Sequence, residues 1–207
     1  MIPEDGNILD IGSNIGITVV PLAERVTRGK VFCFEPIPQH IKTLKRITTY
    51  FHLTNIEIFE TALGDQPGEL TMVMPVMYRV KFQGFSHVAV TESDKEKGDL
   101  YRVPVQRLDN IPALQTLRKI NAIKIDVENF EYPVLKGAED LIMRHKPVIY
   151  CELWDDEKRL LTINYLKNKF GYRVKIFKKN QLVDFNGQPA TNFFFVQAVQ
   201  NASPKFT

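Results

Sequence analysis

The stretch most able to do chemistry in this sequence is residues 10–16, which reads D-I-G-S-N-I-G. It follows an apolar pair and precedes a helix-like pattern over residues 17–26, so it predicts a turn between a strand and a helix. Gly12 and Gly16 allow a tight turn and a close approach between backbone and ligand. Open α/β sheets bind ligands outside the carboxyl ends of their strands, which is where we expect Asp10.

Two further strand-like segments also end in a carboxylate. Residues 30–35 end in Glu35, and residues 123–126 end in Asp126. We expect Glu35 to accept hydrogen bonds from both hydroxyls of a nucleotide ribose, since one carboxylate can accept several. A helix N-cap is the alternative. Asp126 is expected to orient a substrate hydroxyl or to hold an ammonium group of the ligand, with a helix cap again as the alternative.

Other side chains are candidates for moving a proton. Glu128 and Glu131 follow Asp126 closely, and all three carboxylates are candidate bases. His87 is a further candidate, because an imidazole titrates near neutral pH; a surface position is its alternative. Glu152 ends another strand-like segment and could share a divalent cation with Asp126, but no third ligand is evident, so we expect no metal.

The elements that must position these residues alternate between strand and helix patterns. Strands are expected at 8–10, 30–35, 56–61, 123–126, 148–152, 172–177 and 192–199, and helices at 17–26, 39–51, 134–144 and 156–170. The last two strands are expected to turn at Asn186-Gly187. This alternation predicts an α/β fold with a seven-stranded, mostly parallel sheet and an antiparallel terminal strand.

One region breaks the alternation. Residues 64–122 are too many for a simple crossover, and only residues 111–120 within them look helical. We interpret them as an insertion in a single domain of residues 1–207 that helps to shape a substrate pocket.

Length and composition fit one globular domain. The chain has 207 residues, 44% of them hydrophobic, and a formal net charge of +3. The basic group Lys42, Lys45 and Arg46 favours a solvated helix face over a nucleic-acid patch. Cys33 and Cys151 lie in apolar segments and indicate a reduced interior. With no signal-peptide pattern and no apolar run of membrane length, we expect a cytoplasmic protein.

Glycine spacing separates two cofactor classes that such sheets bind. A dinucleotide fingerprint needs G-x-G-x-x-G, whereas Gly12 and Gly16 stand four positions apart. An acidic residue followed by G-x-N-x-G is similar to the S-adenosylmethionine turn of class I methyltransferases. The turn therefore favours S-adenosylmethionine over a nicotinamide cofactor.

Longer motifs resemble the FkbM-type methyltransferases. The similar segments are D-I-G-S-N-I-G at 10–16, F-E-P at 34–36, I-K-I-D-V-E-N-F-E at 123–131, P-V-I-Y-C-E at 147–152 and N-F-F-F-V at 192–196. The resemblance implies a Rossmann-like class I methyltransferase fold, S-adenosylmethionine as donor, and methylation of a hydroxyl on a sugar or other small molecule. Family members usually have glycine where this chain has Asn129, but asparagine tolerates a left-handed backbone.

These readings define an expected site. The residues expected to bind the cofactor are Asp10, Gly12, Ser13, Asn14, Gly16, Glu35, Ala62 and Asp126, and the candidate catalytic residues are Asp126, Glu128 and His87. Many methyltransferases carry helices before the first strand that cover the cofactor. Here Met1 stands close to that strand, so either such a segment is missing from this sequence or the insertion provides the cover.

Three alternatives remain open at this point. A nicotinamide-dependent oxidoreductase shares the sheet and the ribose carboxylate, and a non-catalytic module with the same fold could bind a cofactor or a partner. A nucleic-acid amino-methyltransferase typically has an Asn/Asp-Pro-Pro-aromatic motif after the fourth strand, where this chain has D-V-E-N. We therefore expect a small-molecule or sugar hydroxyl as acceptor, and neither a nucleic acid nor a membrane as partner.

Overall fold

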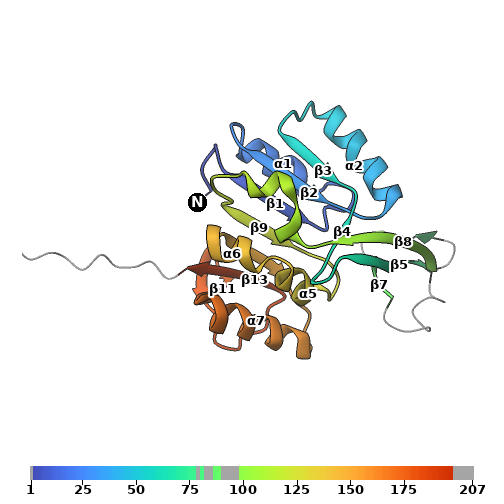
Figure 1. Ribbon diagram of the computed structural model, residues 1–207. Helices are drawn as coiled ribbons and strands as arrows, with labels where there is room; N and C mark the ends of the chain where they lie inside the picture. Colours follow the sequence, from blue (N-terminus) through green and yellow to red (C-terminus); the bar gives the residue numbers. More distant parts are fainter. Residues whose placement is uncertain (1, 78–79, 82–85, 90–97, 198–207) are drawn as a thin grey trace, which may run out of the picture.

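The computed structural model describes residues 2–77, 80–81, 86–89 and 98–197, and it contains two β-sheets (Figure 1). The strands are β1 (Asn7–Ile11), β2 (Lys30–Phe34), β3 (Ile56–Phe59), β4 (Ala62–Leu63), β5 (Gly68–Met77), β6 (Val80–Lys81), β7 (His87–Val88), β8 (Gly98–Gln106), β9 (Ala122–Ile125), β10 (Val148–Glu152), β11 (Tyr172–Lys178), β12 (Gln181–Asp184) and β13 (Asn192–Gln197). The larger sheet has the order β12-β11-β13-β10-β9-β1-β2-β3. The smaller has the order β4-β8-β5-β6, with β7 paired to β5.

The larger sheet is parallel at its centre and antiparallel at one end. Strands β3, β2, β1, β9 and β10 pair in parallel, and β13 runs antiparallel to β10 and β11. The expectation of a mostly parallel sheet with an antiparallel terminal strand is therefore confirmed. In this order β1 lies between β2 and β9, so the strand ends that carry Asp10, Glu35 and Asp126 meet at one edge.

The strand count and the expected final turn were wrong. The sheet has eight strands, because β12 forms a hairpin with β11 before the chain returns as β13. Its turn is Lys179-Asn180, whose φ angles of 49° and 61° are the left-handed values that a tight two-residue hairpin requires. Asn186-Gly187 lies instead in the connection from β12 to β13.

Helices cover both faces of the larger sheet. They are α1 (Val19–Arg25), α2 (Pro38–Tyr50), α4 (Pro112–Gln115), α5 (Glu131–Lys136), α6 (Glu139–His145) and α7 (Glu157–Phe170), with a 3-10 turn at Leu108–Asn110. Alternate strand residues point to opposite faces. On one face Ile8, Val31 and Cys33 pack against α1 and α2. On the other, Leu9 and Phe34 belong to the larger core that includes α4, α5, α6 and α7.

One expected helix is divided in the structure, and another is much shorter than expected. The expected helix over 134–144 is divided into α5 and α6, because the chain turns at Gly137 and Asp109 caps the second piece. The Asp109 carboxylate accepts hydrogen bonds from the N–H groups of Asp140 and Leu141, at 3.2 and 2.9 Å. A Cβ at Gly137 would lie well within 3.0 Å of the Gly64 carbonyl oxygen, so the backbones pass in close contact. The expected helix over 111–120 is helical only in α4.

The smaller sheet is built from β4 and from strands of the region expected to be an insertion, residues 64–122. Strands β5 and β8 form a long antiparallel pair that extends away from the larger sheet (Figure 1). Strand β4 follows β3 after two residues and pairs in parallel with β8. The short connection holds the smaller sheet at the edge where β1, β2 and β9 end.

Candidate functional site

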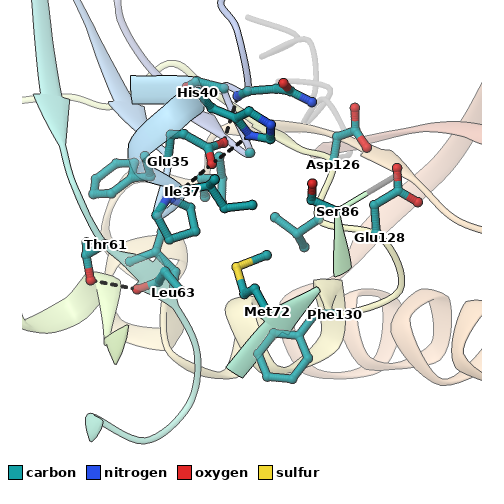
Figure 2. A pocket seen from close by; sticks show the side chains of 18 of the residues that line it. Glu35, Ile37, His40, Thr61, Leu63, Met72, Ser86, Asp126, Glu128 and Phe130 are labelled. Carbon is teal, nitrogen blue, oxygen red and sulfur yellow. Dashed lines mark hydrogen bonds and ion pairs between the residues drawn. The ribbon is translucent and has the colours of Figure 1, made fainter. Parts of the chain in front are cut away.

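A cavity of about 390 Å³ lies between the carboxyl ends of β1, β2 and β9 and the smaller sheet. Figure 2 shows side chains from both sheets around it. From the larger sheet and its loops it is lined by Ile11, Gly12, Ser13, Asn14, Ile15, Ile17, Thr18, Phe34, Glu35, Pro36, Ile37, His40, Thr61, Lys124, Asp126, Val127, Glu128 and Phe130. From the smaller sheet and the residue before β7 it is lined by Ala62, Leu63, Leu70, Met72, Ser86 and Val88.

The glycine turn forms the floor of this cavity. Gly12, Asn14 and Gly16 all have positive φ angles, of 75°, 50° and 94°. A Cβ on Gly12 would lie well within 3.0 Å of the Asp126 carbonyl oxygen, and one on Gly16 would lie 2.7 Å from Leu44 Cδ1. The close approach that demands glycine at position 12 is therefore to the protein's own backbone. This differs from the expected reason, which was contact with a ligand.

Asp10 lies beneath the turn rather than on the cavity. Its side chain is fully buried, Oδ2 accepts a hydrogen bond from the Thr18 hydroxyl at 2.9 Å, and Oδ1 lies 3.3 Å from Lys124 Nζ. The Ser13 hydroxyl donates to the Asp10 carbonyl oxygen at 2.8 Å. Asp10 thus holds the turn in place from below, and Ser13 and Asn14 reach the cavity above it.

Lys124 connects the turn to the next carboxylate. From β9, its Nζ donates to the Gly12 carbonyl oxygen at 2.9 Å and lies 3.6 Å from Asp126 Oδ2. The same Nζ forms the ion pair with Asp10. One ammonium group, on a side chain that is 11% exposed, therefore fixes both acids and the glycine turn relative to each other.

Glu35 is buried at the end of β2 and faces the cavity (Figure 2). Its Oε2 accepts a hydrogen bond from the Asn14 N–H at 2.9 Å, and its Oε1 accepts one from the Ile37 N–H at 2.9 Å. Oε1 also lies 3.2 Å from His40 Nδ1. A carboxylate has about four acceptor positions, so these three contacts leave capacity for a ligand hydroxyl.

An apolar wall stands beside Glu35. Phe34 and Ile37 come from the end of β2 and the start of α2, and Ala62 and Leu63 form β4. All four side chains are buried, with 8% exposure at most. Such a wall can enclose a flat ring system next to the polar groups of Glu35.

The loop after β9 carries the candidate bases. Glu128 and Asn129 adopt left-handed φ angles of 51° and 73°, so asparagine supports the left-handed turn at this position, as expected. Glu131 Oε1 accepts hydrogen bonds from the N–H groups of Val127 and Asn129, at 3.3 and 3.1 Å. Glu131 therefore holds the loop and does not line the cavity, whereas Asp126 and Glu128 do.

Burial and mutual repulsion shift the titration of these acids. The pKa of Glu128 rises to about 7, because the group is desolvated and lies near the charges of Asp126, Glu152 and Glu131. Burial also raises the pKa of Glu131 to about 7, although its backbone hydrogen bonds oppose the shift. Desolvation and Asp126 raise the pKa of Glu152 as well. Glu128 is thus a cavity carboxylate that can exchange a proton near neutral pH.

The structure does not bring His87 to the cavity. It lies on β7, where its neighbours Ser86 and Val88 line the cavity and His87 does not. Successive side chains of a strand point to opposite faces, which accounts for the difference.

Two cavity residues were missed by the sequence reasoning. His40 was assigned no role in the site from the sequence, yet it lies against Glu35. Lys124 received no role, although a lysine between two isoleucines of a buried strand is an available signal: a charge in that position needs a partner.

Two further observations concern the described ranges of the chain. They contain no group of three or more His, Cys, Asp and Glu side chains that could hold a metal ion. They also contain no helix that is both long enough and apolar enough to cross a membrane.

Comparisons with known proteins agree with this geometry. The sequence profile of the methyltransferase FkbM domain matches residues 10–174. Methyltransferase 1 of Beauveria bassiana is 24% identical over 188 residues, which cover 84% of this chain and 75% of that protein.

Solved structures show the same fold. A methyltransferase FkbM from Methylobacillus flagellatus aligns with 93% of this chain at a TM-score of 0.63 and 19% identity, and this chain spans 44% of its length. Fibrillarin from Aeropyrum pernix, solved with natively bound S-adenosyl-L-methionine, aligns with 94% of this chain and 69% of its own at a TM-score of 0.55 and 12% identity. At these identities the likeness establishes an α/β methyltransferase fold.

Proposed function

Because this chain belongs to the FkbM methyltransferase family, we propose that it uses S-adenosylmethionine to methylate a hydroxyl group of a sugar or another small molecule. The observation that carries the proposal is the single cavity shared by the glycine turn, Glu35 and the carboxylates Asp126 and Glu128. Its volume of about 390 Å³ lies within the range of small-molecule sites.

The residues present fit S-adenosylmethionine. The apolar wall of Phe34, Ile37, Ala62 and Leu63 would enclose the adenine, and Glu35 would accept hydrogen bonds from the ribose. His40 Nε2 is buried and has no hydrogen-bond partner among the described residues, so this part of the cavity has an unmatched polar atom. The turn over Ser13 and Asn14 would hold the amino-acid part of the cofactor.

The acids after β9 are suited to the proton transfer that a hydroxyl acceptor requires. When bound, S-adenosylmethionine supplies a methyl group on a sulfonium, and the acceptor oxygen that takes it must give up its proton. Glu128, with a pKa of about 7, can accept that proton near neutral pH. Asp126, held by Lys124, would accept a hydrogen bond from the acceptor and orient it.

The smaller sheet would provide the cover. Leu70 and Met72 of β5 and Val88 of β7 form the apolar side of the cavity opposite the carboxylates. Apolar cover excludes water, which strengthens the electrostatic interactions inside a site. We therefore assign residues 64–122 the role of a pocket-forming insertion within one domain.

Calorimetry with three ligands tests the cofactor. S-adenosylmethionine and S-adenosylhomocysteine should bind, and NAD should not. Binding of NAD alone would favour an oxidoreductase, and binding of none would favour a module with another partner. A panel of sugars and small alcohols, followed by mass spectrometry for a gain of one methyl group, tests the reaction. Cofactor binding with methylation only of amines or nucleic acid would overturn the hydroxyl assignment.

Two matched variants test the roles of the acids. Asp126→Asn and Glu128→Gln keep the shape of each side chain and should lower methyl transfer by about 10²-fold or more, the usual scale of a general base. Affinity for S-adenosylhomocysteine should change much less. Asp155→Asn is the control, because that side chain is 91% exposed and lies outside the cavity. Full activity of Asp126→Asn and of Glu128→Gln would remove both acids from the reaction.

A further inference from the structure

His40 is a buried polar residue that is only half satisfied. It lies in the first turn of α2, and its side chain is 1% exposed. Nδ1 lies 3.2 Å from Glu35 Oε1, whereas Nε2 has no hydrogen-bond partner among the residues that the structure describes. Buried polar atoms are nearly always hydrogen-bonded to protein or to water. Because His40 lines the cavity, a ligand in the cavity can supply the partner that Nε2 needs.

The surroundings of Glu35 fix which ring nitrogen carries the proton. Glu35 accepts hydrogen bonds from the N–H groups of Asn14 and Ile37, which is the behaviour of an ionised carboxylate. An ionised carboxylate can only accept, so His40 Nδ1 must be the donor in their contact. In the neutral ring Nε2 then presents a lone pair. It needs a donor, and a hydroxyl group supplies one.

The position of this lone pair identifies the hydroxyl. His40 and Glu35 both line the cavity, and Figure 2 shows the imidazole beside the carboxylate. A ribose carries two adjacent hydroxyls, and the site has two adjacent acceptors: the remaining capacity of the Glu35 carboxylate and Nε2 of His40.

We propose that His40 is a ribose-binding residue: Nδ1–H holds the Glu35 carboxylate, and Nε2 accepts a hydrogen bond from one ribose hydroxyl of the cofactor. This inference rests on the proposed use of S-adenosylmethionine. It adds to the expected role of Glu35, because Glu35 and His40 would then each accept a hydrogen bond from a different ribose hydroxyl.

Three ligands and one substitution test this role by calorimetry. His40→Asn keeps an amide N–H near the position of Nδ1 and removes Nε2. It should weaken binding of S-adenosylhomocysteine by about tenfold, the scale of one hydrogen bond. With one of the two analogues, 2′-deoxy or 3′-deoxy, the variant and the wild type should bind equally well, because that analogue lacks the hydroxyl that donates to Nε2. If this variant does not fold, His40→Gln takes its place, because its amide lies near the position of Nε2. His40→Gln should still bind one of the two deoxy analogues more weakly than it binds S-adenosylhomocysteine.

The control is the other buried histidine whose Nε2 has no hydrogen-bond partner in the described part of the chain. His145 lies in α6 outside the cavity, so His145→Asn should leave all three affinities unchanged. An equal loss of affinity for all three ligands in His40→Asn would show that the residue acts only on the structure, and no loss would show that it makes no contact. Either result overturns the inference. Failure of the wild type to bind S-adenosylhomocysteine would instead overturn the proposed cofactor, and this inference with it.

Discussion

Replacing Lys124 with methionine should destabilise the protein strongly. Methionine fills a similar volume without a charge, so the change isolates the ammonium group. Without it, Asp10 is fully buried with no cation beside it, and Oδ1 loses the ion pair at 3.3 Å. The Gly12 carbonyl oxygen also loses its 2.9 Å hydrogen bond from Nζ. Removing one partner of a buried ion pair typically costs about 3–5 kcal/mol. Asp126, which is 36% exposed, adds little because water can solvate it.

Urea unfolding at pH 7 measures this cost, and the chain offers a matched control. Lys30 lies in β2, which β1 separates from β9, and pairs with Glu57 at 3.5 Å, but its side chain is 57% exposed. Lys30→Met should therefore change the free energy of unfolding by less than about 1 kcal/mol. Both variants remove a lysine charge from a strand, so the difference between their free energies of unfolding measures the effect of burial.

A double variant tests the cause. Asp10→Asn removes the charge that Lys124→Met leaves buried, so adding it should restore stability relative to Lys124→Met alone. A cost below about 1 kcal/mol for Lys124→Met, or a double variant no more stable than it, would refute the assignment of the lysine as the partner of Asp10.

Three further predictions concern stability. Gly12→Ala should lower the free energy of unfolding by about 3 kcal/mol or more in urea titration, because its Cβ would strike the Asp126 carbonyl oxygen and φ is 75°. Titration across pH should show the wild type losing stability relative to Glu128→Gln as pH rises from about 4.5 to about 7. The folded pKa of Glu128 exceeds its ordinary value of 4.5, so folding favours the protonated form and ionisation opposes it. Asp156→Ala should cost about 1 kcal/mol in thermal unfolding, because its carboxylate caps α7.

Each of these has a control. Gly187→Ala introduces the same left-handed strain, at φ 89°, with no atom within 4 Å of the new Cβ, so it should cost clearly less than Gly12→Ala. Equal losses in the free energy of unfolding for the two variants would contradict the destabilising contact with the Asp126 carbonyl oxygen. A pH dependence identical in wild type and Glu128→Gln would contradict the raised pKa. Glu157→Ala, next to the cap, should have little effect, and a cost equal to that of Asp156→Ala would contradict the capping role.

The parallel core of the fold was predictable because its strands are buried on both faces. Such strands appear as short apolar runs, as at residues 30–34, and helices between them repeat apolar positions at helical spacing. The end of α7 was also readable, since Gly171 takes the left-handed φ of 71° that ends a helix. Hairpin β11–β12 was not predictable from the sequence, because Lys179-Asn180 is not a usual turn pair.

The division of α5 from α6 depends on contacts that sequence periodicity does not contain. Asp109, thirty residues earlier, supplies the cap, and Gly64 supplies the close backbone contact. The same distinction holds in the site. Glu35 and Asp126 were found because they end strands, whereas His40 and Lys124 depend on the partners that the fold brings to them.

The pairing of β1 with β9 has a consequence for the order in which the protein can assemble. Lys124 reaches the Gly12 carbonyl across 112 residues of sequence, so during synthesis the glycine turn exists long before its lysine. Strands β1, β2 and β3 and helices α1 and α2 can pair and pack first, but one edge of β1 then stays open until β9 emerges. Open edges invite wrong strand pairing, and long-range parallel contacts form slowly. The nascent chain is therefore exposed to wrong strand pairing at this edge while residues 60–121 are being made, and the cavity lacks the residues that follow β9 until that interval ends.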